Sequence, residues 1–169
     1  MANEFPKVSS CLHRIMVPVI FLFSGVMFLV VLTQVIFRYV LSHPLPWSEE
    51  SARYLMIWVA CLAASEAYAK GNHIGVTLIT ATVKPALRKI MTLAIHLIVA
   101  ALCGFIAYQG FFLGFLLWEQ VSPAMEIPMT FPYLAIPTGA SLIFIQALAL
   151  FFQKVREPPI QDSEACELK

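Results

Sequence analysis

The chain has 169 residues, of which 60% are hydrophobic and only 12% are charged, and its formal net charge is +1. Soluble domains carry about 25% charged residues, so this composition excludes an ordinary soluble domain and predicts an integral membrane protein. No basic cluster suggests a nucleic-acid partner, and we expect the partner surface to be the lipid bilayer.

The apolar runs predict an all-α membrane protein with four long, tilted transmembrane helices joined by short interfacial segments. The first run is longer than the apolar core of a cleaved signal peptide, so we expect it to be retained. Residues 1–155 should form a single four-helix membrane domain, and residues 156–169 a polar, disordered cytoplasmic tail. The expected spans are about 15–38, 49–70, 88–118 and 127–153.

The connection after the first span gathers charges, prolines and aromatic side chains at the edge of the membrane, beginning at Arg38. Pro44 and Pro46 cannot continue a regular helix, because proline lacks an N–H and pushes the preceding residue toward extended geometry. Tyr39 and Trp47 are the aromatic types that anchor at the headgroup level. We therefore expect a short interfacial stretch that ends just before the second helix.

The second helix is predicted to start with Ser48 as its N-cap and to stop at Gly71. Glu49 and Glu50 lie in the first turn, where the helix dipole favours acidic residues. Arg53 follows them by four and three residues, so all three side chains share one face. Two hypotheses remain open: a charge-paired helix entrance, or a pairing that also reaches a partner protein.

Near the other end of this helix, Glu66 precedes Lys70 by four residues. This spacing predicts an interfacial ion pair, with a proton or ion ligand as the less favoured alternative. The next connection contains His73 and mixes apolar with small polar residues up to Pro85, which is typical of an interfacial turn or a short amphipathic helix.

The third helix carries small residues at four-residue intervals, namely Ala100 with Gly104 and Gly110 with Gly114. Small residues let helix backbones approach closely in lipid. The spacing predicts packing against the other helices of this chain or, alternatively, docking to another membrane protein.

An acidic connection containing Glu119 and Glu126 leads into the fourth helix, which includes Pro128, Pro132 and Pro137. Pro137 should leave the carbonyl near Tyr133 without a donor and kink the helix. Discontinuous helices bind ions in some transporters, but no charge accompanies this one.

The positive charges predict the orientation of the chain. Nine of the 11 Lys and Arg residues lie in the two tails and the second connection, and the other two lie in the first connection. Both termini should therefore be cytoplasmic.

Residues for chemistry within the membrane are scarce. The first, third and fourth spans contain no acidic or basic residue in their interiors, and His96 is the one titratable candidate inside the third. We expect His96 to be a packed or interfacial histidine, since a haem site would need a second ligand at matching depth. The cysteines occur singly, which does not favour a metal or disulfide site, and no catalytic motif appears. The sequence thus predicts no enzyme and no catalytic, cofactor-binding or metal-binding residue.

Six stretches in this order resemble the small, DctQ-like membrane subunit of tripartite ATP-independent periplasmic (TRAP) transporters. They lie between about residues 36 and 140 and are Arg38-Tyr39, Pro44-Leu-Pro-Trp-Ser-Glu-Glu50, Ala52-Arg-Tyr-Leu55 with Trp58, Gly71-Asn-His-Ile-Gly-Val76, Pro123-Ala-Met-Glu-Ile-Pro-Met129 and Tyr133-Leu-Ala-Ile-Pro-Thr-Gly139. One departure is Thr77, where the family often has an acidic residue.

The resemblance implies a subunit of the bacterial inner membrane that associates with a large TRAP membrane subunit, where the sodium and substrate sites lie. No cofactor is then expected in this chain. A periplasmic binding protein would deliver an organic acid such as a C4-dicarboxylate or a sialic acid. The role implied for this chain is a scaffold that braces the large subunit during sodium-coupled secondary transport.

The resemblance also makes the charged and aromatic residues candidates for ion pairing or partner contact. These are Arg38, Trp47, Glu49, Glu50, Arg53, Glu66, Lys70, His73 and Glu126. Two rival hypotheses are a self-sufficient four-helix carrier that uses Glu66 and a cofactor-bearing anchor of a redox complex that uses His96.

Overall fold

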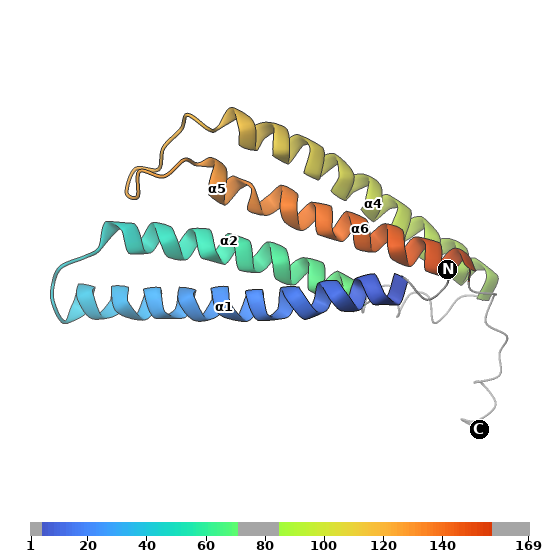
Figure 1. Cartoon of the computed structure of the whole chain (residues 1–169), viewed down its shortest axis with the longest axis horizontal. Coiled ribbons are helices and arrows are strands. Elements are labelled where there is room, and N and C mark those ends of the chain that lie inside the picture. Colours follow the sequence, from blue (N-terminus) through green and yellow to red (C-terminus); the bar gives the residue numbers. More distant parts are fainter. Residues whose placement is uncertain (1–4, 71–84, 157–169) are drawn as a thin grey trace, which may run out of the picture.

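A computed structural model describes residues 5–70 and 85–156 of the chain (Figure 1). The predictions for His73, Thr77 and the tail after Arg156 fall outside these residues. The described part is helical, and its only bridge between extended residues joins Val121 to Pro128. The helices are α1 Phe5–Tyr39, α2 Pro46–Ala69, α4 Pro85–Leu116, α5 Thr130–Tyr133 and α6 Ala135–Arg156. The prediction of an all-α fold is confirmed.

The first helix, α1, is 35 residues long and continues through Pro18. It starts at Phe5, ten residues before the predicted span. The helix therefore includes polar N-terminal residues that precede the apolar run. Arg38 lies in its last turn, where a cation complements the helix dipole. Just beyond the helix, Ser42 has a φ of 52°, a left-handed conformation that helps to turn the chain back.

The predicted start of α2 is wrong by three residues, because the N-cap is Leu45 and not Ser48. The helix begins at Pro46 after the extended residue Leu45, and Ser48 lies inside the first turn instead of capping it. Proline suits the first helical position because its φ is already helical and its missing N–H has no partner to lose there. The Ser48 hydroxyl donates to the Leu45 carbonyl at 2.7 Å. Because the helix begins at Pro46, Trp47 lies within it rather than ahead of it.

The third long helix, α4, spans 32 residues and ends at Leu116, so the predicted end at Trp118 is two residues too late. The last carbonyl groups of a helix have no partner within that helix. One of them, on Gly114, accepts a hydrogen bond of 3.0 Å from the buried Thr130 hydroxyl at the start of α5. This bond joins the end of α4 to the segment that returns across the bundle.

The predicted continuous helix over 127–153 is instead divided into α5 and α6, with Leu134 between them. The predicted kink near Tyr133 therefore occurs as a break of one residue. Pro137 lacks an N–H, so it cannot donate to the Tyr133 carbonyl four residues earlier. The segment also begins later than predicted, at Thr130, since Ile127 and Pro128 belong to the preceding loop.

The long helices run alternately up and down the molecule (Figure 1). The loop between α1 and α2 and the loop between α4 and α5 lie at one end, which we call the loop end. The start of α1, the start of α4 and the end of α6 lie at the opposite end, which we call the terminal end.

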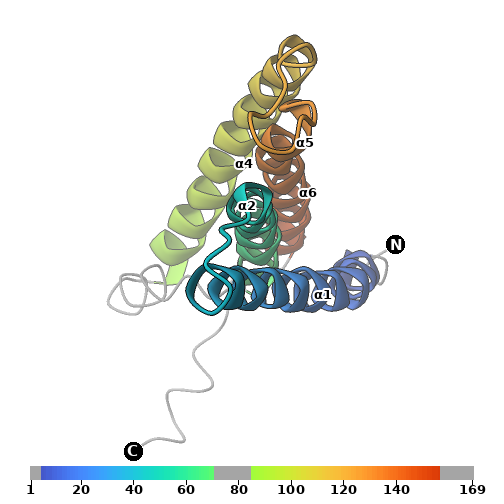
Figure 2. The ribbon, with the colours of Figure 1, turned by 90° about the vertical axis from the view of Figure 1, so that its left-hand side faces the viewer.

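Helix α2 holds the two halves of the bundle together. It packs on α1 on one side and on α6 on the other, and α6 packs along α4 (Figure 2). The core at the α2, α4 and α6 junction is built from the buried residues Tyr68, Ala100 and Ala147. A Cβ placed on Gly139 of α6 would lie 2.8 Å from the Cβ of Cys61 on α2, so only glycine permits this close approach.

Three segments of the described chain are long and apolar enough to cross a membrane: His13–Tyr39, Lys89–Leu116 and Thr130–Arg156. Helix α2 does not qualify by this composition test; its 24 residues include Glu49, Glu50, Arg53 and Glu66. The structure therefore contains three of the four predicted spans by length and composition.

Candidate functional site

Polar side chains of α2 form two clusters, one at each end of the helix. The Glu50 cluster, at the loop end, consists of Glu50 and Tyr54 of α2 with Ser122, Ala124 and Met125 of the α4–α5 loop. The Glu66 cluster, at the terminal end, consists of His13 of α1 with Glu66 and Lys70 of α2. The two clusters tie α2 to different neighbours.

In the Glu50 cluster, one carboxylate holds the loop against α2. The Tyr54 hydroxyl donates to Glu50 Oε1 at 2.6 Å, and the backbone N–H groups of Ala124 and Met125 donate to Oε2 at 3.2 and 3.1 Å. Glu50 lies in the first turn of α2, outside the three candidate spans. Hydrogen bonds from the hydroxyls of Ser122 and Tyr54, followed by those from the loop backbone, hold the pKa of Glu50 below its ordinary value of 4.5.

The loop has its own hydrogen bonds in addition to those with Glu50. The Ser122 N–H donates to the Ile127 carbonyl at 2.9 Å, and the Met129 N–H donates to the Gln120 carbonyl at 2.8 Å. Glu126 sits at the tip with a φ of 53° and an exposed side chain. The predicted partner residue Glu126 is thus available at the surface of an ordered turn.

The other charged and aromatic candidates at the loop end have exposed side chains. Arg53 Nη2 lies 4.0 Å from Glu49 Oε1, and both side chains are about two-thirds exposed, so this pair adds little stability. Arg38 forms no ion pair with any residue that the structure describes. Trp47 is 44% exposed in the first turn of α2. The structure therefore separates the two predicted acids: Glu49 faces Arg53, whereas Glu50 faces the loop.

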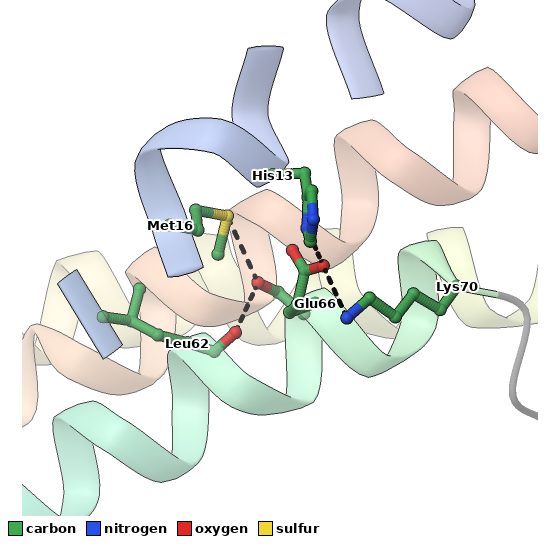
Figure 3. A network of polar contacts seen from close by, with 6 residues as sticks. His13, Met16, Leu62, Glu66 and Lys70 are labelled. Carbon is green, nitrogen blue, oxygen red and sulfur yellow. Dashed lines mark hydrogen bonds and ion pairs between the residues drawn. The ribbon is translucent and has the colours of Figure 1, made fainter. Parts of the chain in front are cut away.

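In the Glu66 cluster, a buried carboxylate is placed between two basic side chains (Figure 3). Glu66 is 7% exposed, and its Oε1 contacts His13 Nδ1 and lies 3.5 Å from Lys70 Nζ. Its Oε2 is buried and has no hydrogen-bond partner in the described part of the chain. Sequence spacing predicted the Lys70 pair and missed the His13 contact, because 53 residues separate His13 from Glu66.

His96, the titratable candidate inside α4, contacts a side chain of α2. The Tyr68 hydroxyl and His96 Nδ1 lie 2.7 Å apart, and the two rings meet edge to face with centroids 6.0 Å apart. His96 is half-buried and Tyr68 is buried. This packing agrees with the expectation that His96 is a packed histidine.

The small residues of α4 pack within this chain. A Cβ on Gly110 would lie 2.9 Å from the Pro137 ring, and one on Gly114 would lie 3.2 Å from the Leu134 side chain. Gly104 similarly faces Phe144 of α6, and Ala100 is 3% exposed in the core. Of the two hypotheses for the GxxxG spacing, intrachain packing matches these contacts.

The described residues 5–70 and 85–156 contain no group of three or more His, Cys, Asp or Glu side chains that could hold a metal ion. They do form an apolar groove of about 270 Å³ between α1, α2 and the α5 region. Its lining residues are Phe23, Tyr54, Leu55, Trp58, Ile127, Phe131 and Pro132. The polar contacts of Glu50 and Glu66 join α2 to other parts of this chain.

Comparison with known proteins assigns this architecture to a family. The family model described as "Tripartite ATP-independent periplasmic transporters, DctQ component" matches residues 27–157, which include α2 and both of its polar clusters except His13. The chain belongs to the DctQ family. The resemblance predicted from sequence is confirmed, and the chain is a small TRAP transporter permease subunit.

Two relatives named as TRAP transporter small permease proteins support the same family assignment. The C4-dicarboxylate TRAP transporter small permease protein DctQ of Rhodobacter capsulatus is 31% identical over 122 residues, covering 70% of this chain and 54% of the relative. A putative TRAP transporter small permease protein of Haemophilus influenzae is 29% identical over 115 residues, covering 66% of this chain and 69% of the relative.

A third relative has a compound name. The isethionate TRAP transporter permease protein DctMQ of Oleidesulfovibrio alaskensis is 28% identical over 112 residues, covering 65% of this chain but only 18% of the relative. The chain therefore spans about half of one DctQ relative and under a fifth of the DctMQ protein. Together with the three apolar helices, family membership makes this DctQ-family chain a multi-pass inner-membrane protein, a transporter component and not an enzyme.

Proposed function

We propose that this DctQ-family chain is a scaffold subunit that braces a large TRAP membrane subunit and contains no transport path of its own. The observation that carries this proposal is the distribution of charge along the described helices. The basic residues of the three candidate spans are Arg14, Arg38, Lys89, Lys154 and Arg156, and all of them lie near the ends of these spans. A path for ions or anionic substrates normally needs ionisable residues at mid-membrane depth.

The large membrane subunit is proposed as the partner because of the relative named DctMQ. A protein named DctMQ is a single permease in which the region similar to this chain accounts for 18% of the length. The remaining length leaves room for a much larger membrane component. In this proposal the large component is a separate polypeptide that associates with the chain within the bilayer, and the lipid-facing side of α1 and α4 widens the fixed scaffold.

We also propose that α2 is the fourth crossing and that both ends of the chain face the cytoplasm. Helices α1 and α4 end together at the loop end, yet α4 starts at the terminal end. If α1 and α4 cross the membrane, the chain must return between them, and α2 is the helix placed to do so. Its 24 residues measure about 36 Å at ~1.5 Å per residue, enough for a core of about 30 Å.

The substrate class proposed is an organic anion delivered by a periplasmic binding protein, with sodium bound in the large subunit. Two relatives are named for isethionate and for C4-dicarboxylates, which are both small organic anions. Sodium and substrate sites are assigned to the partner because the described residues offer no cluster of three or more His, Cys, Asp or Glu side chains, and the groove beside Trp58 is apolar.

The two alternative functions are less favoured by the contacts. A self-sufficient carrier would need Glu66 accessible to substrate, but its carboxylate is buried between α1 and α2 and paired with His13 and Lys70. A haem anchor would need two axial ligands that face a common space, whereas the His96 ring packs edge to face against Tyr68 of α2.

Affinity purification of the full chain from native membranes in mild detergent tests the proposal. We expect a multi-span protein of the large TRAP subunit type, identified by mass spectrometry, in about equal amount with the tagged chain. A chain that purifies alone, or only with further copies of itself, would contradict the scaffold role and favour the self-sufficient carrier.

A further inference from the structure

Acidic and basic residues are distributed unevenly between the two ends of the bundle. Four of the five acidic residues in the described ranges 5–70 and 85–156 lie at the loop end, namely Glu49, Glu50, Glu119 and Glu126. The fifth, Glu66, lies toward the terminal end, where it is buried and paired with His13 and Lys70. Among the described residues, the exposed charges of the terminal end are therefore basic.

Two helices bring three of these basic residues together at the terminal end. Lys89, near the start of α4, donates from Nζ to the carbonyl oxygen of Val155 in the last turn of α6, at 3.5 Å. Val155 stands between Lys154 and Arg156 in the sequence. The first turn of α4 contains no acidic residue, and its helix dipole adds positive potential there. We call Lys89, Lys154 and Arg156 the α4–α6 patch.

The α4–α6 patch lies where the apolar core of a membrane meets the headgroups. Lys89 is the first residue of the candidate span Lys89–Leu116, and the candidate span Thr130–Arg156 ends at Arg156. Lys89 and Lys154 are half-buried, so their alkyl stems can lie on apolar surface while the ammonium groups reach the headgroup layer. The patch is therefore at the depth of lipid phosphates.

Large apolar side chains are exposed in the same turns as these cations. Leu87 and Ile90 lie beside Lys89 on α4, and Phe152 and Val155 lie beside Lys154 on α6, and each is about half exposed or more. A soluble anion would satisfy the cations but leave this apolar surface in contact with water. A phospholipid satisfies both, because it carries a phosphate and two acyl chains.

We propose that the α4–α6 patch binds the headgroup of an anionic phospholipid, whose acyl chains lie on the exposed apolar side chains beside it. Basic sites between membrane helices suit anionic headgroups electrostatically. The Arg156 guanidinium can donate two parallel hydrogen bonds to a phosphate, and each lysine supplies a point charge. The bound lipid joins the start of α4 to the end of α6. This inference needs only the membrane location of the chain and does not rest on the scaffold role.

Native mass spectrometry of the full chain in detergent micelles tests this site, with phosphatidylglycerol as the anionic probe and phosphatidylcholine as the zwitterionic probe. We expect phosphatidylglycerol to bind more tightly. One Lys or Arg near a membrane surface contributes about fivefold to the affinity for anionic lipid, so Lys89→Gln should weaken phosphatidylglycerol binding roughly fivefold. The double variant Lys89→Gln with Lys154→Gln should weaken it roughly 25-fold. Lys89→Arg should retain binding, because it keeps the charge.

Arg38→Gln is the matched control, because Arg38 is an exposed cation at the loop end, and it should leave phosphatidylglycerol binding unchanged. Arg156 is also exposed, so Arg156→Gln tests the patch with little effect on packing. Equal binding of the two lipids by the wild-type chain, or equal losses in Lys89→Gln and Arg38→Gln, would overturn the proposal and leave protein acids as the partners of these cations. Displacement of the lipid by excess inorganic phosphate would overturn it in favour of a soluble anion.

Discussion

Glu50 Oε2 accepts a hydrogen bond of 3.1 Å from the backbone N–H of Met125, across 75 residues of sequence. This contact fixes the α4–α5 loop to the first turn of α2, and with it the end of the bundle proposed to face the periplasm. Among the described residues, the neighbouring Glu49 makes no such contact and pairs only with the exposed Arg53. Two adjacent acids of identical chemistry therefore have different structural roles.

The first prediction compares these two acids. Glu50→Gln removes the charge that accepts the loop N–H groups, so we expect faster hydrogen exchange at Ala124 and Met125 and earlier proteolysis within residues 117–129. Glu49→Gln is the matched control and should leave both measurements unchanged, because its ion pair is exposed. Equal effects of the two substitutions would contradict the assigned role of Glu50.

The second prediction concerns pH at the same cluster. The pKa of Glu50 is lower in the folded protein than its ordinary value of 4.5. Its contribution to loop attachment is therefore complete above about pH 4.5 and is lost as the pH falls through the lower folded value. Exchange at Met125 should rise below pH 4.5 in the wild-type chain, and Glu50→Gln should lack this acid-dependent step.

The third prediction concerns the hydrogen bond that links α4 to α5. Thr130→Val keeps the side-chain shape but leaves the Gly114 carbonyl without its buried donor, which should cost about 1–3 kcal/mol of stability. Thr33→Val on exposed α1 removes only a bond to its own helix at Leu29 and should change stability little. Denaturation in detergent followed by circular dichroism compares the two, and equal stability would contradict the role of Thr130.

The fourth prediction uses the glycines. Gly139→Ala places a methyl group 2.8 Å from the Cβ of Cys61 and should destabilise the α2–α6 contact by about 1–3 kcal/mol through overpacking. Gly25→Ala, on a face of α1 with no neighbour within 4 Å, should be neutral or stabilising. A Gly139→Ala variant as stable as Gly25→Ala would mean that α2 and α6 are not this close.

The structure also explains which features could be predicted from sequence. Helix order, the break after Tyr133 and the Glu66–Lys70 pair arise from apolar runs, proline chemistry and i,i+4 spacing, which are local. The contacts of Glu50 with Met125 and of Glu66 with His13 join residues 75 and 53 positions apart, and no local pattern encodes them.

Two local predictions were wrong for physical reasons. Ser48 fits the residue type of an N-cap, but Pro46 is already preorganised for the first helical turn and starts α2 earlier. The apolar run up to Trp118 does not keep the chain helical after Leu116, because the chain there must turn into the loop that Glu50 holds.

The fifth prediction tests whether α2 crosses the membrane. In a chain without its four native cysteines, single cysteines at Ser42 and Pro123 should react with an impermeant thiol reagent from the same side of oriented membrane vesicles, and one at Lys70 from the opposite side. Reaction of Lys70→Cys from the same side as Ser42→Cys would place α2 along the surface and leave three crossings.

Uptake into proteoliposomes tests the central claim most directly. The large subunit and its binding protein would be reconstituted with and without this chain, and accumulation of radiolabelled succinate and isethionate would be measured under an inward sodium gradient. We predict uptake of at least one of these anions only when all three proteins are present, and none by this chain alone. Full-rate uptake without the chain, or uptake by the chain alone, would contradict its role as a scaffold subunit.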